Sequence, residues 1–287
     1  MTPCILRRLA ALALPALLAF GAVAGRPTQA AAQKRATVPW VSGELLEYDV
    51  KFGSITAGSG RISVVGHDTV RGRDTWRLRF NVTGGIRFIY RLNDTFESFF
   101  DSEKLVALRF NQNLSEGNRD TKRLYEIYPD RKVYTKNGGE EMPSVAQPLD
   151  DASFLFFVRS IPLEVGKTYE FDRYYDPKSN PVIVKVLRRD TIDVPAGRFP
   201  TIVVQPIIKT SGIFSEGGKA ELWLSDDKYH NLIQMKTKLN FGSLNLYLKK
   251  ITIPGTGTGA KAAPRPKQPQ RRTRCTNERR LAASTRN

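Results

Sequence analysis

Apolar and polar side chains alternate along much of this chain, and this period of two predicts β-strands. In residues 46–52 and 76–82, apolar side chains occupy every second position, with charged or amide side chains between them. Residues 233–239 and 244–249 repeat the pattern. Such alternation buries one face of a strand and leaves the other in water, as antiparallel sheets with one solvated face require.

Further strands are predicted between segments rich in turn-forming residues. Residues 128–131 (YPDR) predict a short hairpin turn, and residues 137–139 (NGG) predict a break. Residues 194–197 (VPAG) have Pro second and Gly fourth, which suits a type I turn closed by a glycine bulge. The additional strands are expected near residues 58–66, 95–101, 105–113, 121–128, 131–135, 168–175, 181–193, 199–209 and 218–225.

One segment, DASFLFFVRS, predicts a short helix near residues 150–160. Asp150, Asp151 or Ser153 can cap its start, because their side chains accept hydrogen bonds from free backbone N–H groups. The helix should end before Pro162, since the residue before proline avoids the helical conformation. Its apolar side chains would plug an open sheet.

These elements predict an all-β, mostly antiparallel fold of about a dozen strands with one short helix. We expect a strongly curved sheet or an open barrel. A membrane-spanning barrel is the competing fold, because its strands also alternate. The long basic segment after the last strand and the many charges on the polar faces count against it.

The first residues have the pattern of a secretory signal peptide. Arg7 and Arg8 precede an apolar run at residues 9–20, and Ala22-Val23-Ala24 supplies small residues for cleavage. The apolar run is shorter than the roughly 20 residues of a spanning helix. We therefore expect residues 1–24 to be a signal peptide and the mature protein to be exported.

The charge divides the rest of the chain. The formal net charge is +17, but residues 255–287 carry nine Lys or Arg and one Glu, and residues 1–36 carry five Lys or Arg and no acid. The remaining residues 37–254 have a net charge of only +4, which gives no reason to expect a nucleic-acid partner. We expect a flexible lead-in at 25–36, a single β-rich domain at 37–254 and a disordered basic tail at 255–287. The tail could contact an anionic membrane or envelope polymer.

Residue types that carry catalysis or bind metals are scarce. Past the signal the chain keeps one cysteine, Cys275, so it has no internal disulfide. His67 and His230 are the only histidines, both in predicted turns or strand ends, and no HExxH, GxSxG or P-loop pattern occurs. We expect no enzyme, no catalytic residues, no metal site and no cofactor.

Carboxylates offer the remaining route to catalysis. The neighbouring pairs Asp150-Asp151 and Asp226-Asp227 are interpreted as a helix cap and a turn, because adjacent side chains on an extended chain point to opposite faces. A second set of acids could gather at one edge of the sheet, namely Glu44, Glu47, Asp94, Glu97 and Asp101. They leave open a hydrolase of envelope polymer that uses two carboxylates.

Apolar residues in connecting segments suggest a ligand site. They follow Gly84-Gly85 and precede Gly217-Gly218, and large apolar side chains in such segments often line or cover a hydrophobic cavity. The alternative is that they close the ends of the core. The predicted ligand-binding residues are Ile86, Phe88, Ile89, Tyr90, Ile213 and Phe214.

Four blocks of the sequence resemble the domain of unknown function 3108 family of bacterial exported proteins. They are residues 43–53 (GELLEYDVKFG) with Ile55, Ala57 and Gly58; residues 93–98 (NDTFES) with Asp101; residues 194–199 (VPAGRF); and residues 212–214 (GIF) leading to 222–227 (LWLSDD). The resemblance implies a β-rich protein of the cell envelope, periplasmic in a Gram-negative bacterium. It implies no known reaction and no catalytic residues.

The sequence therefore predicts a non-enzymatic envelope protein that binds or carries an apolar, lipid-like ligand. The first alternative is an assembly or interaction protein that contacts its partners through a sheet edge and the basic tail. The second alternative is the carboxylate-dependent hydrolase. An apolar void inside the sheet would favour the carrier, and solid packing would favour the assembly protein.

Overall fold

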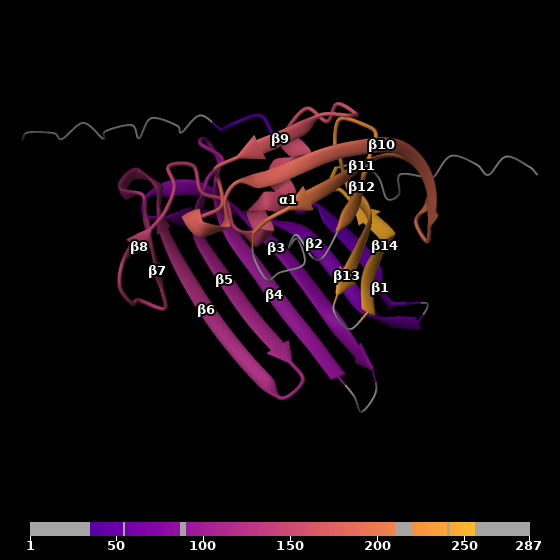
Figure 1. Ribbon diagram of the computed structural model, residues 1–287, viewed down its shortest axis with the longest axis horizontal. Coiled ribbons are helices and arrows are strands. Elements are labelled where there is room, and N and C mark those ends of the chain that lie inside the picture. The colour runs from indigo at the N-terminus through magenta and orange to yellow at the C-terminus, as the bar shows by residue number, and fades with distance from the viewer. Residues whose placement is uncertain (1–34, 54, 87–89, 210–219, 240–241, 256–287) are drawn as a thin grey trace, which may run out of the picture. The chain divides into compact units, whose positions relative to one another are not determined.

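The computed structural model describes residues 35–53, 55–86, 90–209, 220–239 and 242–255. They form one sheet of fourteen strands, shown in Figure 1, whose strand pairs are all antiparallel. The strands are β1 Leu45–Phe52, β2 Ile55–Val70, β3 Arg73–Ile86, β4 Tyr90–Asp101, β5 Ala107–Glu116, β6 Arg119–Tyr128, β7 Val133–Lys136, β8 Met142–Pro143, β9 Thr168–Phe171, β10 Val182–Val194, β11 Gly197–Ile207, β12 Glu221–Ser225, β13 Leu232–Leu239 and β14 Gly242–Thr252.

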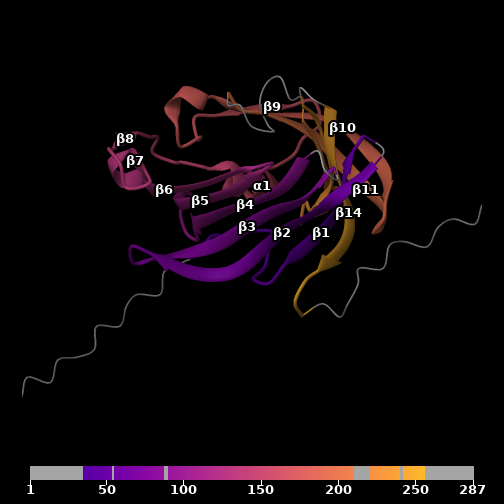
Figure 2. The ribbon, with the colours of Figure 1, turned by 90° about the horizontal axis from the view of Figure 1, so that it is seen from below.

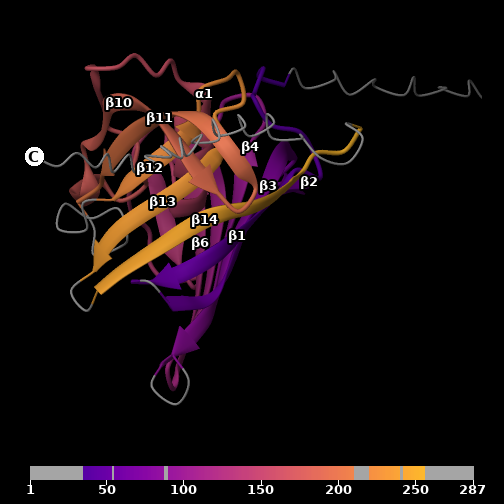
Figure 3. The same ribbon diagram turned by 90° about the vertical axis from the view of Figure 1, so that its right-hand side faces the viewer.

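The first and last strands lie side by side in the middle of the sheet. β1 pairs with β2 on one side and with β14 on the other, so the sheet ends at β8 and β9. Figure 2 shows the sheet curling from β6 through β1 and β14 toward β9, and Figure 3 shows β12, β13 and β14 running side by side toward β1. The result is an open, strongly curved sheet.

Irregular pairing bends the sheet near β1. The register shifts between Glu47 and Tyr48 against β14 and between Val50 and Lys51 against β2. Such bulges increase the local twist of a strand. Gly58 on β2 lies opposite Gly84 on β3, and a Cβ atom on Gly58 would lie 2.0 Å from the Thr83 carbonyl oxygen, so the two backbones approach too closely for any side chain there.

The core lies on the concave face of the sheet and includes the helix α1 (Asp151–Ser160). Residues 152–159 of α1 are all buried, as expected for a helix that is apolar on every side. Aromatic rings also stack across neighbouring strands, with centroids 6.0 Å apart for Phe80 and Phe96 and 6.4 Å for Phe96 and Phe110. Each such contact adds about 0.5–1.5 kcal/mol beyond the burial of area.

A connecting segment joins the two free margins of the sheet. Leu149, before α1, forms an isolated bridge with Tyr174, which follows β9, and the Tyr175 N–H donates to the Leu149 carbonyl at 3.0 Å. The Ser144 hydroxyl also donates to the Tyr175 carbonyl at 2.7 Å. Two short 3-10 helices, η1 Pro129–Arg131 and η2 Pro177–Ser179, complete the described elements.

The predicted fold class is confirmed: an all-β antiparallel sheet, strongly curved and open, with one helix at residues 151–160. Each predicted strand overlaps an observed one, and the turns at 128–131, 137–139 and 194–197 separate strands as predicted. The two-residue strand β8 (Met142–Pro143) was not predicted, because two residues are too few to show alternation. The domain boundaries at residues 24, 36 and 254 stay predictions.

None of the helices in the described part of the chain has the length and hydropathy needed to cross a membrane.

Candidate functional site

The position of α1 is fixed at its first turn. Asp150 is the N-cap, and its side chain accepts hydrogen bonds from the backbone N–H groups of Ala152 and Ser153. The Ser153 hydroxyl accepts the Asp150 N–H at 2.8 Å, which completes a capping box. The prediction of a cap at this carboxylate pair is confirmed. The cap sets the direction in which the helix enters the concave face.

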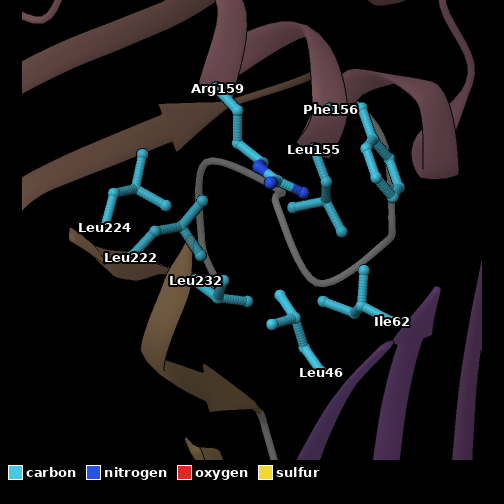
Figure 4. Close-up of a pocket in the computed structure, with 8 residues that line it drawn as sticks. All are labelled: Leu46, Ile62, Leu155, Phe156, Arg159, Leu222, Leu224 and Leu232. Atoms are coloured by element: carbon cyan, nitrogen blue, oxygen red, sulfur yellow. The ribbon is translucent and has the colours of Figure 1, made fainter. Parts of the chain in front are cut away.

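A small apolar pocket lies between α1 and the strands that face it, as Figure 4 shows. Its empty volume is about 290 Å³ when space open to solvent is included, and the room between its side chains admits about one water molecule. Seven of the eight lining side chains are apolar, and the eighth is Arg159. The lining residues are Leu46, Ile62, Leu155, Phe156, Arg159, Leu222, Leu224 and Leu232.

The guanidinium group of Arg159 is held by three acceptors on one side of this pocket. Its Nη1 donates to Glu44 Oε1 at 2.7 Å, its Nη2 to Asn231 Oδ1 at 2.8 Å, and its Nε to the Tyr229 carbonyl at 3.1 Å. The Arg159 and Glu44 side chains are only 4% and 3% exposed. This buried ion pair ties the last turn of α1 to the start of β1 and to the loop before β13.

Aromatic rings pack behind Arg159. The guanidinium lies 5.8 Å from the Trp40 ring centroid and 5.4 Å from that of Phe156, within the range of cation–π attraction. Trp40 also contacts Phe156 edge to face at 5.3 Å. The buried indole N–H groups of Trp40 and Trp76 have no acceptor among the described residues. The pocket therefore has apolar walls with aromatic rings behind Arg159, and its one cation is already neutralised by Glu44.

A second polar cluster lies at the other end of α1. The Ser98 hydroxyl donates to Asp150 Oδ2 at 2.6 Å, and the Tyr174 hydroxyl donates to Asp151 Oδ1 at 2.9 Å. Gln112 Nε2 reaches Asp151 Oδ2 at 3.3 Å. Burial raises the pKa of Asp150 to about 7, with the neighbouring Asp151 adding to the rise, and burial also raises the pKa of Asp151.

Of the six predicted ligand-binding residues, only Ile86 and Tyr90 lie in the described part of the structure. Their backbones pair at the adjoining ends of β3 and β4. Phe88, Ile89, Ile213 and Phe214 lie outside the described residues. That prediction therefore stays a prediction. The pocket found here is lined by other residues, all of them in strands, in the helix or at strand ends.

Only a weak signal for the observed pocket is present in the sequence. Arg159 was visible as a cation in an otherwise apolar helix, but a basic residue in the last turn of a helix is ordinary, since it complements the helix dipole. Its partner Glu44 lies 115 residues away. No local sequence pattern indicates a contact between residues so far apart in the chain.

The two histidines have structural contacts. His67 Nδ1 lies 3.1 Å from Asp74 Oδ1, and its ring packs on Trp76 with centroids 3.9 Å apart. His230 Nδ1 lies 3.0 Å from the Arg159 carbonyl oxygen. Within the described ranges, no three His, Cys, Asp or Glu side chains are grouped so as to hold a metal ion.

The acids proposed for a hydrolase do not form a pair across a cleft. Glu97 lies on the outer face with Arg77 and Arg79, at 2.9 and 2.6 Å. Asp101 pairs with Arg73 at 2.6 Å, and Glu47 with Arg61 at 3.6 Å. Glu44 binds Arg159 inside the sheet, and Asp94 accepts the Ser115 N–H at 3.0 Å.

The neighbouring acids Asp226 and Asp227 form a turn, as predicted. Asp226 binds Arg189, and Asp227 accepts the backbone N–H groups of the residues that follow.

Several solved structures are similar to the chain. A β-barrel-like protein of the domain of unknown function 1849 from Brucella abortus shares 10% sequence identity, covering 76% of this chain and 99% of its own, with a TM-score of 0.47. A protein from Parabacteroides distasonis, provisionally described as a lipoprotein, shares 11% identity over 76% of this chain and 100% of its own, with a TM-score of 0.34. A domain from Vibrio parahaemolyticus, provisionally described as from an outer-membrane lipoprotein-sorting protein, shares 11% identity over 76% and 88%, with a TM-score of 0.21.

No curated protein matches the chain at a significant level. One family model does match it, over residues 47–249, and its description is "Protein of unknown function (DUF3108)". The matched range runs from β1 into β14 and contains α1 and every residue that lines the pocket except Leu46. The chain belongs to this family of unknown function, as its sequence blocks predicted.

Proposed function

We propose that this protein is an exported, non-enzymatic protein of the cell envelope that binds a slender apolar ligand, such as the end of a lipid chain. The observation that carries the proposal is the apolar pocket between α1 and the concave face of the sheet. Burying one methylene group there is favourable by about 0.8 kcal/mol, and the walls offer almost nothing else to bind. The Arg159 guanidinium is neutralised by Glu44, so a charged group gains little by entering.

The size of the pocket limits the ligand. Sites for drug-sized molecules have volumes of about 300–1,000 Å³ and enclose most of the ligand. Here the space between the side chains admits only about one water molecule. A single unbranched chain that enters between leucine side chains fits such a site better than a fused ring does.

A filling variant tests the site. Leu155 lines the pocket and is 8% exposed, so Leu155→Trp should occupy the space and reduce binding of a fluorescent long-chain fatty acid at least tenfold. Leu124→Trp is the matched control, because Leu124 is 39% exposed on β6 and does not line the pocket. Circular dichroism melts show whether both variants fold. A Leu155→Trp protein that folds and binds the probe as well as wild type would contradict the proposal.

Ligand retained from the cell gives a second readout. Native mass spectrometry of the full chain, purified without detergent, should show an added mass that organic extraction removes. The extracted material should contain alkyl chains. Protein that is consistently free of added mass and also fails to bind the fatty acid would overturn the proposal.

A further inference from the structure

One half of β6 forms an unpaired margin of the sheet. β6 runs from Arg119 to Tyr128, but β7 pairs only with Tyr125–Tyr128. The lower part of β6 in Figure 1 is the outermost strand on this side. Residues 119–123, which we call the free β6 edge, are therefore paired with β5 on one side only. An unpaired strand edge is a template on which another extended chain can add hydrogen bonds.

The backbone direction along this edge follows from Leu124. The Leu124 N–H donates to Asn137 Oδ1 at 2.8 Å, and the Leu124 carbonyl accepts the Asn137 N–H at 2.7 Å, so both groups point away from β5. In an antiparallel pair, alternate residues point their backbone groups toward the same neighbour. The N–H and C=O groups of Lys122 and Asp120 therefore also point away from β5, and no described residue pairs with them.

The other free margin is less suited to a partner strand. β9 pairs with Val182–Lys185 of β10, and the segment before β9 bonds Val186, which leaves residues 187–194 paired with β11 on one side only. This part of β10 begins with a register shift between Val186 and Arg188, and the Thr191 N–H is already bonded to Asp190 Oδ1 at 2.8 Å. Bulges and self-satisfied backbone groups protect an edge. The register of β5 with β6 has no shift, so the free β6 edge is regular.

Charge selects the kind of partner. The free β6 edge, RDTKR, has three cations and one acid. Arg119 and Arg123 lie on one face of the strand, because they are four residues apart, and Lys122 lies on the other. Lys122 and Arg123 form no ion pair with a described side chain; Arg123 donates instead to Gln112 at 3.2 Å. A second copy paired antiparallel about Thr121 would set Arg119 opposite Arg123, which is unfavourable, but also Asp120 opposite Lys122, which is favourable, so the two effects offset each other. Acidic residues of a partner strand would face both arginines without that repulsion.

We propose that the free β6 edge binds an extended acidic segment of a partner protein, which joins the sheet as an added strand. Backbone N–H and C=O groups of Asp120 and Lys122 supply the hydrogen bonds, and Arg119 and Arg123 select acidic residues at alternate positions of the partner. This interaction is independent of the apolar pocket. Alternatively, these charges serve to prevent the free β6 edge from pairing with any other strand, in which case no peptide should bind there.

A peptide of defined sequence tests the proposal. An eight-residue peptide with alternating Glu and Val, blocked at both ends, should bind the full chain with a Kd of about 100 µM at low salt. The same peptide with Lys in place of Glu should bind at least tenfold more weakly. Hydrogen exchange should slow at the Asp120 and Lys122 amides when the acidic peptide is present. Loss of binding in high salt is expected, because these charges are exposed and screened.

Two matched variants separate the backbone from the side chain. Lys122→Pro removes the N–H that points away from β5 and leaves the bonds to β5 in place, so peptide binding should be lost. Lys122→Ala keeps that N–H and should weaken binding less than fivefold. A third variant, Arg119→Glu with Arg123→Glu, should prefer the Lys peptide. Absence of acidic-peptide binding to the wild-type chain at 1 mM, or equal binding by the Pro and Ala variants, would overturn the proposal.

Discussion

Glu44→Leu is expected to lower the free energy of unfolding by about 3–5 kcal/mol, because it leaves a buried guanidinium without its counter-ion. Arg159 is 4% exposed and its Nη1 lies 2.7 Å from Glu44 Oε1. Asn231 and the Tyr229 carbonyl still accept hydrogen bonds from Arg159 in the variant, but neither neutralises its charge. Urea denaturation of wild type and variant measures the difference.

The double variant Glu44→Leu with Arg159→Met identifies the cause. Removing both charges should recover part of the loss, since a buried ion pair is often replaced by apolar side chains at little cost. Glu47→Ala is the control, because its partner Arg61 is 3.6 Å away and 63% exposed, and surface pairs contribute about 0–1 kcal/mol. If Glu44→Leu lowers the free energy of unfolding no more than Glu47→Ala does, the buried ion pair does not hold α1 to the sheet.

Much of the fold was predictable because strand alternation is a local signal. In β1 the side chains of Leu46, Tyr48 and Val50 are buried and those between them are not, and the same period is visible in the sequence. The order of strands was not predictable in the same way. The pairing of β1 with β14 joins residues about 200 positions apart, so it depends on how the whole sheet curls and on no single segment.

The candidate site was less predictable for a related reason. Leu222 and Leu224 could be recognised as core residues of a strand, and Leu155 as part of an apolar helix. Nothing in the sequence indicates that they meet around a small space, because the volume left between side chains depends on packing. The Glu44–Arg159 ion pair could not be predicted for the same reason. Glu44 was grouped with other acids at a possible sheet edge, whereas its side chain turns inward to the helix.

Acidification from pH 7 to pH 4 is expected to raise the contribution of Asp150 to the free energy of unfolding. The folded-state pKa is raised to about 7 by burial, from an ordinary value of 3.8. Between these two values the folded protein binds a proton at Asp150 and the unfolded chain does not. Stability from this group therefore increases as the pH falls, by up to about 1.4 kcal/mol per pH unit, and is constant above pH 7 and below pH 4.

Asp150→Asn should remove this slope without removing the helix cap. Asparagine caps helices as well as aspartate does, and its carbonyl oxygen can accept from Ala152 and Ser153 as the carboxylate does. Its amide can donate to the Ser98 hydroxyl, which donates to Asp150 in the wild type. The variant should be more stable than wild type above pH 7, because the carboxylate buried at position 150 is replaced by a neutral amide.

Asp190→Asn is the control of opposite sign. The pKa of Asp190 is lowered, chiefly by the hydrogen bond from the Trp223 indole and also by the Thr191 N–H, so its contribution to stability is present at neutral pH and is lost as the pH falls. Urea denaturation of the three proteins at pH 7.5, 6, 5 and 4 compares the slopes. The free energy of unfolding of wild type minus that of Asp150→Asn should increase as the pH falls. A flat difference, or one of the opposite sign, would show that the Asp150 carboxylate stays ionised inside the protein, with Ser98 and the capping N–H groups outweighing the cost of burying it.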